Sequence, residues 1–270
     1  VCGFDPTELT VENFEIYSRA IGGKLTPVSG LVANLRRIKS DAEVARIEAA
    51  AVVTDRALVE VESMLNDGVT ERDIRDELEY LMHRYGSDGP SYETIVATGL
   101  NGARPHHRPT YERIVEGHAV VIDVGALIDG YHSDMTRTYL IGEVDPVLAE
   151  IHQVVREAQL LGLAMIAPGV LCSDVDRVCR QHITEHGYGP EFAHGTGHGV
   201  GLQIHELPWL RKDFFEPLHA GEVVTVEPGV YRGGLGGVRI EDLVLVTPTG
   251  SRILTHSQKD HLCLQSPRTT

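Results

Sequence analysis

The chain has 270 residues, enough for a large buried core in a single domain of the α/β or α+β type. Its 39 acidic and 24 basic residues give a formal net charge of −15, which disfavours nucleic acid and anionic membranes as partners because both would be repelled. The most apolar run, near residues 160–171, is interrupted by Gly162, Pro168 and Gly169 and is too short to cross a membrane.

The first 40 or so residues carry mixed patterns that glycine and proline break into short pieces, as at Gly22, Pro27 and Gly30. We expect a lead-in segment here rather than a complete domain. From Asp41 onward the pattern becomes helical, because apolar residues recur at a helical spacing and Gly68 follows as a stop.

A second helix is predicted from Thr70, a good N-cap, to about Tyr85, and it ends at Gly86. Helical periodicity returns at about residues 147–163 and 173–186. Strands are predicted at residues 92–98, 119–128, 132–141, 222–226 and 238–246. This order, without a helix after every strand, favours an antiparallel or mixed α+β sheet over a doubly wound one.

The turn Asp129-Gly130 between two of these strands predicts a hairpin with a two-residue loop. Its register pairs Gly125 with Asp134 and puts Asp123 on the same face, with Cβ atoms within roughly 7 to 8 Å of each other across the diagonal. Two carboxylates on an apolar strand pair repel each other unless a cation or a proton lies between them. The simpler interpretation is a strand-end carboxylate and an exposed or capping one.

Two more carboxylates lie on apolar strands. Glu227 ends the run Val-Val-Thr-Val, and Glu241 lies within the run of residues 238–246, on the same strand face as Arg239. An ion pair of Glu241 with Arg239 alone is the alternative to a metal-binding role.

The segment of residues 194–205 holds His194, His198 and His205 among four alternating glycines, which let the backbone approach other groups closely. It matches neither a dinucleotide fingerprint nor a phosphate loop, and His205-Glu-Leu-Pro-Trp is not the H-E-x-x-H zinc motif. One histidine with four carboxylates is oxygen-rich ligation, which suits manganese, cobalt or iron better than a thiolate zinc site does.

The four cysteines, Cys2, Cys172, Cys179 and Cys263, form neither a dense disulfide framework nor a C-x-x-C pair. They indicate a reducing, cytoplasmic compartment. The chain opens at Val1 without an initiator methionine or a basic and apolar leader, so we expect a fragment or a processed form.

Taken together, the motifs resemble the metallopeptidases of the pita-bread fold, which include methionine aminopeptidase, Xaa-Pro aminopeptidase and prolidase. The resemblance rests on two aspartates separated by ten residues, then Gly-His-Gly-Val-Gly, Glu-Pro-Gly-Val-Tyr and Val-Arg-Ile-Glu-Asp. It implies an α+β pita-bread fold, in which helices cover a curved, mostly antiparallel sheet. It also implies two divalent metal ions, with manganese expected and cobalt, iron or zinc as the other candidates, on Asp123, Asp134, His198, Glu227 and Glu241.

Other positions match the active-site histidines of that family: His106 in Arg-Pro-His-His, His194 and His205, with His107 as the second choice to His106. The segment Leu35-Arg-Arg-Ile-Lys-Ser resembles the entry into the catalytic domain of the proline-directed members. The resemblance therefore implies a catalytic domain over residues 36–270, with residues 1–35 as the remnant of an N-terminal domain or a linker. A homodimer is implied for the full-length form.

The implied activity is removal of the first residue from Xaa-Pro peptides or dipeptides, by attack of a hydroxide shared by the two metal ions. Glu227 is expected to accept the proton of the water, His205 to donate to the oxyanion and His106 to contact the substrate. Arg239 is expected to orient Glu241 or to receive a substrate carboxylate. The alternatives are methionine aminopeptidase, a metal-free creatinase-like enzyme, and an inactive pita-bread binding module; the last two have no use for five intact ligands.

Overall fold

A computed structural model of the chain describes residues 1–65 and 68–259, so Cys263 and the end of the predicted catalytic domain lie outside the described residues. Within this part of the chain, no helix is both long and apolar enough to cross a membrane.

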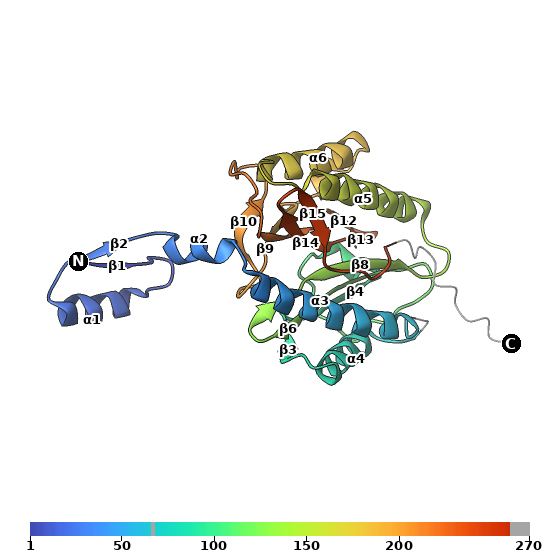
Figure 1. Cartoon of the computed structure of the whole chain (residues 1–270). Coiled ribbons are helices and arrows are strands. Elements are labelled where there is room, and N and C mark those ends of the chain that lie inside the picture. The colour runs from blue at the N-terminus through green and yellow to red at the C-terminus, as the bar shows by residue number, and fades with distance from the viewer. Residues whose placement is uncertain (66–67, 260–270) are drawn as a thin grey trace.

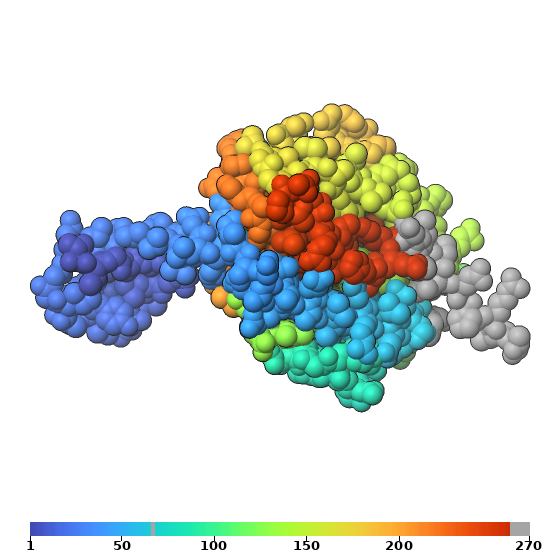
Figure 2. All heavy atoms as spheres, viewed as in Figure 1, coloured from blue at the N-terminus to red at the C-terminus, as the bar shows by residue number. Residues whose placement is uncertain are grey.

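The first 30 residues form a small lobe that projects from the main body (Figures 1 and 2). In this lobe, β1 (Cys2–Phe4) pairs in parallel with β2 (Leu25–Pro27), and α1 (Val11–Ile21) joins the two strands. Thr10 caps α1 by accepting a hydrogen bond from the backbone N–H of Asn13. The lobe is thus a β-α-β unit, more regular than the broken sequence pattern indicates.

Helix α2 (Leu31–Arg37) leads from the lobe into the body, and ion pairs fasten its end there. Arg36 and Lys39 both pair with the buried carboxylate of Glu206, with 2.7 Å between Lys39 Nζ and Glu206 Oε1. Arg37 pairs with Glu222, whose side chain is fully buried. The basic segment that ends the lead-in therefore fixes the chain to the start of β10 (Glu206–Leu210) and to the residue before β11 (Val223–Val226).

Two helices follow, as predicted. α3 (Asp41–Glu62) begins at a capping box between Ser40 and Glu43, and α4 (Glu71–Arg84) begins at one between Thr70 and Asp73. Their apolar faces pack together and against β-strand residues such as Val120 in one core cluster. A second pair, α5 (Pro146–Met165) and α6 (Cys172–Glu185), is likewise confirmed, and it packs against other strands.

The strands lie between these two helix pairs, with α5 and α6 above and α3 and α4 below in Figure 1. One sheet has the strand order β10-β9-β11-β14-β15, and three smaller ones have the orders β4-β5-β8, β3-β6-β7 and β12-β13. Their bounds are β3 Gly89–Pro90, β4 Ile95–Thr98, β5 Ala119–Val124, β6 Ala126–Ile128, β7 Tyr131–His132, β8 Met135–Leu140, β9 Gly197–Gly199, β10 Glu206–Leu210, β11 Val223–Val226, β12 Gly229–Arg232, β13 Gly236–Arg239, β14 Asp242–Thr247 and β15 Gly250–Ile253. The 3-10 turns are η1 (Gly99–Ala103) and η2 (Gly189–Glu191).

Every described strand pair from β3 to β15 is antiparallel, which agrees with the predicted α+β sheet. The predicted hairpin register is also confirmed, because Asp123 pairs with Thr136 and Leu127 with His132 around the loop Asp129-Gly130. Both loop residues have positive φ, 50° and 79°, as a turn of this type requires.

The first three predicted strands differ from their predicted bounds. The predicted strand of residues 92–98 begins only at Ile95. The hairpin strands are each divided, at Gly125 and at residues 133–134, because the hairpin passes from one small sheet to another there. A Cβ at Gly125 would lie 2.0 Å from the carbonyl oxygen of Ser133, so only glycine permits this passage.

The predicted strand of residues 238–246 is in fact two strands, β13 and β14, which belong to different sheets. Between them the backbone N–H of Glu241 donates to the carbonyl of Thr136 over 3.1 Å. The chain thus changes strand partners at Ile240 and Glu241, and the apolar pattern could not reveal this because both halves are buried. The prediction of one continuous strand was wrong.

Candidate metal centre

A cavity of about 730 Å³ opens among the strands of the body. Its lining includes all the candidate site residues named from the sequence: His106, Asp123, Asp134, His194, His198, His205, Glu227, Arg239 and Glu241. The second-choice histidine, His107, lines it as well. Residues that are up to 135 positions apart in the chain therefore meet at one place.

The hairpin supplies the first two carboxylates. Asp123 lies near the end of β5, and Asp134 lies just before β8, where the two strands diverge. The hydroxyl of Tyr92 lies between them: it donates to Asp134 Oδ1 over 2.5 Å and also contacts Asp123 Oδ1. Sequence reasoning missed Tyr92, which comes from the segment between β3 and β4 that was predicted as strand.

His198 comes from β9, at the centre of the glycine-rich segment. Its Nδ1 lies 3.0 Å from the carbonyl oxygen of Gly199, which can only accept, so the proton is on Nδ1 and Nε2 carries a lone pair. That Nε2 lies 3.5 Å from Asp134 Oδ2 and 3.4 Å from Glu227 Oε1. Burial lowers the pKa of His198 to about 3, so the ring is neutral, as a metal ligand must be.

The two glutamates complete the set of carboxylates. Glu241 is 1% exposed and accepts a 2.7 Å hydrogen bond from Thr136 Oγ1. Glu227 follows directly after β11 and faces His198. Burial, together with the charge of Asp134 and Glu227, raises the pKa of Glu241 well above its ordinary value. Burial raises the pKa of Glu227 to about 7, against the opposing pull of Arg239.

Arg239 pairs with Asp123, not with Glu241 as one interpretation of the strand pattern suggested. Its Nη2 lies 2.6 Å from Asp123 Oδ2, its Nη1 donates to the hydroxyl of Tyr231 over 2.7 Å, and its Nε donates to Thr136. The strand break between β13 and β14 explains the difference, because Arg239 and Glu241 no longer project from one regular strand face.

The donor set fits divalent cations. Ligand atoms of Asp134, His198 and Glu241 all lie within 4.8 Å of one another, and all three residues are buried. Burial and the neighbouring charges of Asp123 and Glu227 raise the pKa of Asp134 well above its ordinary value. The cavity thus holds four carboxylates, and the guanidinium of Arg239 pairs with only one of them, Asp123. Bound cations would neutralise the excess of negative charge.

The three rim histidines differ in how freely they face the cavity. His194 Nδ1 lies 2.7 Å from the carbonyl of Gly195, so it donates there, and Nε2 accepts from the hydroxyl of Tyr231 over 2.8 Å. Burial lowers the pKa of His194 to about 4. Both of its nitrogens are therefore engaged by the protein and its ring is neutral.

His205 and His106, in contrast, are exposed at the rim. The ring centroid of His205 lies 4.3 Å from that of His198, edge to face, and 6.5 Å from that of Trp209. His107 is buried, and its Nε2 lies 2.9 Å from Glu71 Oε2. Of the two neighbouring histidines, only His106 is thus exposed at the cavity, where it can contact a substrate.

Glu71 is a further residue that sequence reasoning missed. Its fully buried carboxylate accepts from the backbone N–H groups of Thr98 and Thr110, from the hydroxyl of Thr110, and from Asn101 and His107, all within 2.9 Å. Burial raises the pKa of Glu71, but these hydrogen bonds outweigh it and hold the pKa below its ordinary value. One charge thus organises the loop that carries His106. Its position in the first turn of a helix, where acids are common, gave no hint of this.

A second loop is held from α6. Asp176 accepts hydrogen bonds from the backbone and the hydroxyl of Thr196, and Arg180 donates to the carbonyl of His194 over 2.6 Å. Asp176 and Arg180 also form an ion pair, with 2.9 Å between Oδ1 and Nη2. The position of the glycine-rich segment therefore depends on side chains of the helix before it.

Comparison with known proteins places these features in context. Residues 45–248 match the model of metallopeptidase family M24. The chain is 41% identical over 263 residues to an uncharacterised peptidase of Bacillus subtilis, which covers 97% of this chain and 74% of that protein. It is 39% identical over 252 residues to the Xaa-Pro dipeptidase of Pyrococcus furiosus, covering 93% of this chain and 72% of that one. The solved structure of an Xaa-Pro dipeptidase from Bacillus anthracis matches with a TM-score of 0.95 at 42% identity, over 97% of this chain and 74% of that one.

Proposed function

The chain belongs to metallopeptidase family M24, and we propose that it removes the N-terminal residue from peptides or dipeptides whose second residue is proline. The predicted family and its pita-bread fold are thereby confirmed, and the protein is a metal-dependent peptidase. The observation that carries the proline specificity is the identity of 39% and 42%, over more than nine-tenths of the chain, to two proteins named Xaa-Pro dipeptidase.

Two divalent metal ions, when bound, supply a Lewis acid that polarises the peptide carbonyl and lowers the pKa of water. We assign them to the five side chains named from the sequence, which are Asp123, Asp134, His198, Glu227 and Glu241. The set holds four carboxylates and one imidazole, and this hard character supports manganese over zinc, with cobalt and iron as the other candidates.

Glu227 is the proposed general base. Its carboxylate lines the cavity, with 3.4 Å between Oε1 and His198 Nε2, and so faces the place where the metal ions would hold a water molecule. Its Oε1 takes the proton of the attacking water. His205, exposed at the rim beside His198, donates a ring N–H to the oxygen of the scissile carbonyl as negative charge develops there. His106 contacts the substrate from the opposite loop.

His194 and Arg239 act by holding other groups. Arg239 donates to Tyr231, and Tyr231 donates to His194, which forms a chain of hydrogen bonds along one wall of the cavity. The same guanidinium holds Asp123 through its Nη2. We propose that this chain keeps the Asp123 carboxylate in position while the substrate binds.

A proline in second position has a tertiary amide without an N–H, so the pocket must hold its ring by shape. Ile204 and Trp209 line the cavity beside His205 and present apolar surface for such a ring. An ordinary peptide leaves an N–H without an acceptor against the same surface and is bound less well.

The test compares Ala-Pro-Ala with Ala-Ala-Ala and Met-Ala-Ser, with the same preparation in manganese, and uses Ala-Pro to separate dipeptidase from aminopeptidase activity. We expect Ala-Pro-Ala or Ala-Pro to be cleaved with the highest kcat/KM. A clear preference for Met-Ala-Ser would move the assignment to methionine aminopeptidase, the second candidate from the sequence. Elemental analysis of the same preparation identifies the metal.

We propose a cytoplasmic location, supported by the free thiols of Cys172 and Cys179, whose pKa values burial raises to about 12. We also propose a division near residue 36 between the projecting lobe and the catalytic domain, and a homodimer in the full-length form. Light scattering on the full-length form tests the dimer: a mass equal to that of one subunit would contradict it.

A further inference from the structure

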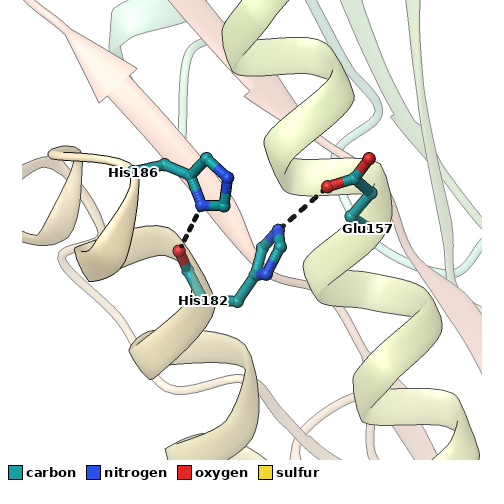
Figure 3. Close-up of side chains that lie close together, drawn as sticks. All are labelled: Glu157, His182 and His186. Carbon is teal, nitrogen blue, oxygen red and sulfur yellow. Dashed lines mark hydrogen bonds and ion pairs between the residues drawn. The ribbon is translucent and has the colours of Figure 1, made fainter.

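A second group of metal-ligating side chains lies outside the cavity, where α5 and α6 pack side by side. Glu157 on α5 faces His182 and His186 at the end of α6 (Figure 3). His182 Nε2 lies 3.2 Å from Glu157 Oε2, and one ligand atom from each of the three residues lies within 4.8 Å of the others. The three donors thus come from two helices and converge on one point.

The two histidines share a helix face because they are four positions apart, the spacing that also brings together the histidines of helical zinc motifs. His186 is the C-cap of α6, and its Nδ1 donates to the backbone carbonyl of His182 over 2.8 Å. That bond fixes the tautomer and leaves the lone pair on Nε2, which points toward α5 in Figure 3. A ligating histidine in proteins is commonly held by this kind of bond.

Glu157 is held in a similar way. Its Oε1 accepts a 2.5 Å hydrogen bond from Gln153 Nε2, one helical turn earlier, which leaves Oε2 facing His182. His182 Nε2 is buried, and among the residues that the structure describes it makes no well-formed hydrogen bond. A buried ring nitrogen beside a carboxylate oxygen needs a partner between them. Either a proton or a metal ion can supply it.

We propose that Glu157, His182 and His186 bind a zinc ion that links α5 to α6. Two imidazoles and one carboxylate are the borderline donor set that zinc takes, unlike the carboxylate-rich set of the cavity. His186 is exposed, so water can fill the fourth position. The site is separate from the proposed catalytic centre, with which it shares no residue.

The ion stabilises α6, a helix whose side chains hold part of the cavity wall in place. α6 carries Asp176 and Arg180, whose hydrogen bonds hold the backbone of Thr196 and His194. An ion that binds the folded pair of helices and not the unfolded chain adds its binding free energy to the stability of the protein. Its role is structural, and the peptidase reaction does not require it.

The experiment measures zinc in four otherwise identical proteins: the wild type, His186→Ala, Glu157→Gln and, as a matched control, His83→Ala. His83 is an exposed histidine on α4, so its loss changes the histidine count without touching the site. All four are first loaded with manganese, then equilibrated with zinc and dialysed. Zinc that replaces manganese in the cavity is common to all four, so the difference between proteins reports the α5–α6 site.

We expect the wild type and His83→Ala to retain one zinc ion more than His186→Ala. The zinc affinity of that extra site should fall by at least about tenfold in Glu157→Gln. Zinc should raise the Tm of the wild type and of His83→Ala by more than that of the other two. Equal zinc content in all four proteins would overturn the proposal, as would a zinc-induced rise in Tm that is the same in all four. Circular dichroism verifies that each variant is folded.

Discussion

The carboxylates and the histidines of the cavity are held in different ways. Asp123, Asp134 and Glu241 lie on or beside sheet strands, where register and burial fix them. His106 and His194 lie in loops, and each loop is fastened by a buried charge on a helix: Glu71 for the first and Asp176 for the second. His205 lies on the loop before β10 and is exposed.

Because of this difference, substitutions of the two groups of side chains should have different effects. The strand carboxylates cannot move apart when their charges repel, and burial with these neighbouring charges raises the pKa values of Asp134 and Glu241. The loop histidines His106 and His194 depend instead on a few hydrogen bonds for their position. Substitutions among the carboxylates should therefore lower metal binding, whereas those among the loop histidines His106, His194 and His205 and their anchors should lower catalysis with metal binding unchanged.

The largest effect is expected from Asp134→Asn or Glu241→Gln. Each removes the charge of a proposed metal ligand while it keeps the side-chain volume, so activity should be abolished and metal content should fall, with the fold intact. Asp41→Asn, an exposed acid in the first turn of α3, is the control and should retain both. Full metal occupancy with normal turnover in the two site variants would defeat the assignment.

His205→Ala tests whether a loop histidine acts in catalysis and not in metal binding. Turnover should fall by about a hundredfold or more, the usual scale for one oxyanion donor, while metal content changes little. Steady-state kinetics with Ala-Pro-Ala and elemental analysis give the two readouts. If metal is lost instead, His205 is a ligand, and the roles of His198 and His205 must be exchanged.

Glu71→Gln weakens the anchor of the loop that carries His106. The amide replaces an acceptor with a donor that faces other donors, so the loop should shift, and kcat/KM should fall roughly ten- to a hundredfold with metal content unchanged. Glu79→Gln, on the same helix, is the control. A Glu71→Gln protein that keeps full activity and a normal Tm would show that the anchor does not position the histidine.

The smallest effect is a pH dependence of metal binding. In the metal-free protein the pKa of Glu227 is about 7, and those of Asp134 and Glu241 are also raised, so a cation must displace protons in order to bind. Affinity should therefore rise with pH, by about tenfold in all between pH 6 and 8 for the proton that Glu227 releases. His198, with a pKa of about 3, stays neutral over this range and contributes nothing to the slope.

Calorimetry of manganese binding at pH 6, 7 and 8, in two buffers with different heats of ionisation, measures both the affinity and the protons released. Equal affinity at pH 6 and pH 8 would contradict the raised pKa values.

Much of the fold could be predicted because its patterns are local. The helices at residues 41–62 and 71–84 have clear caps and apolar stripes, and the hairpin around Asp129-Gly130 has the turn residues that fix its register. The break of residues 238–246 into β13 and β14 could not be predicted. Both halves are apolar and buried, so only their different partner strands distinguish them.

For the centre, the sequence alone supplied a hypothesis, five side chains as candidate metal ligands, and a correct placement, Asp123 and Asp134 on one face of a hairpin. These follow from residue type and from a period of two along a strand, which act over short distances. The folded structure was needed to show that Tyr92 lies between the two aspartates, that Arg239 pairs with Asp123, and that Glu71 holds the His106 loop. A hydrogen bond or ion pair between distant segments depends on where the fold brings them, and no local pattern in the sequence encodes that distance.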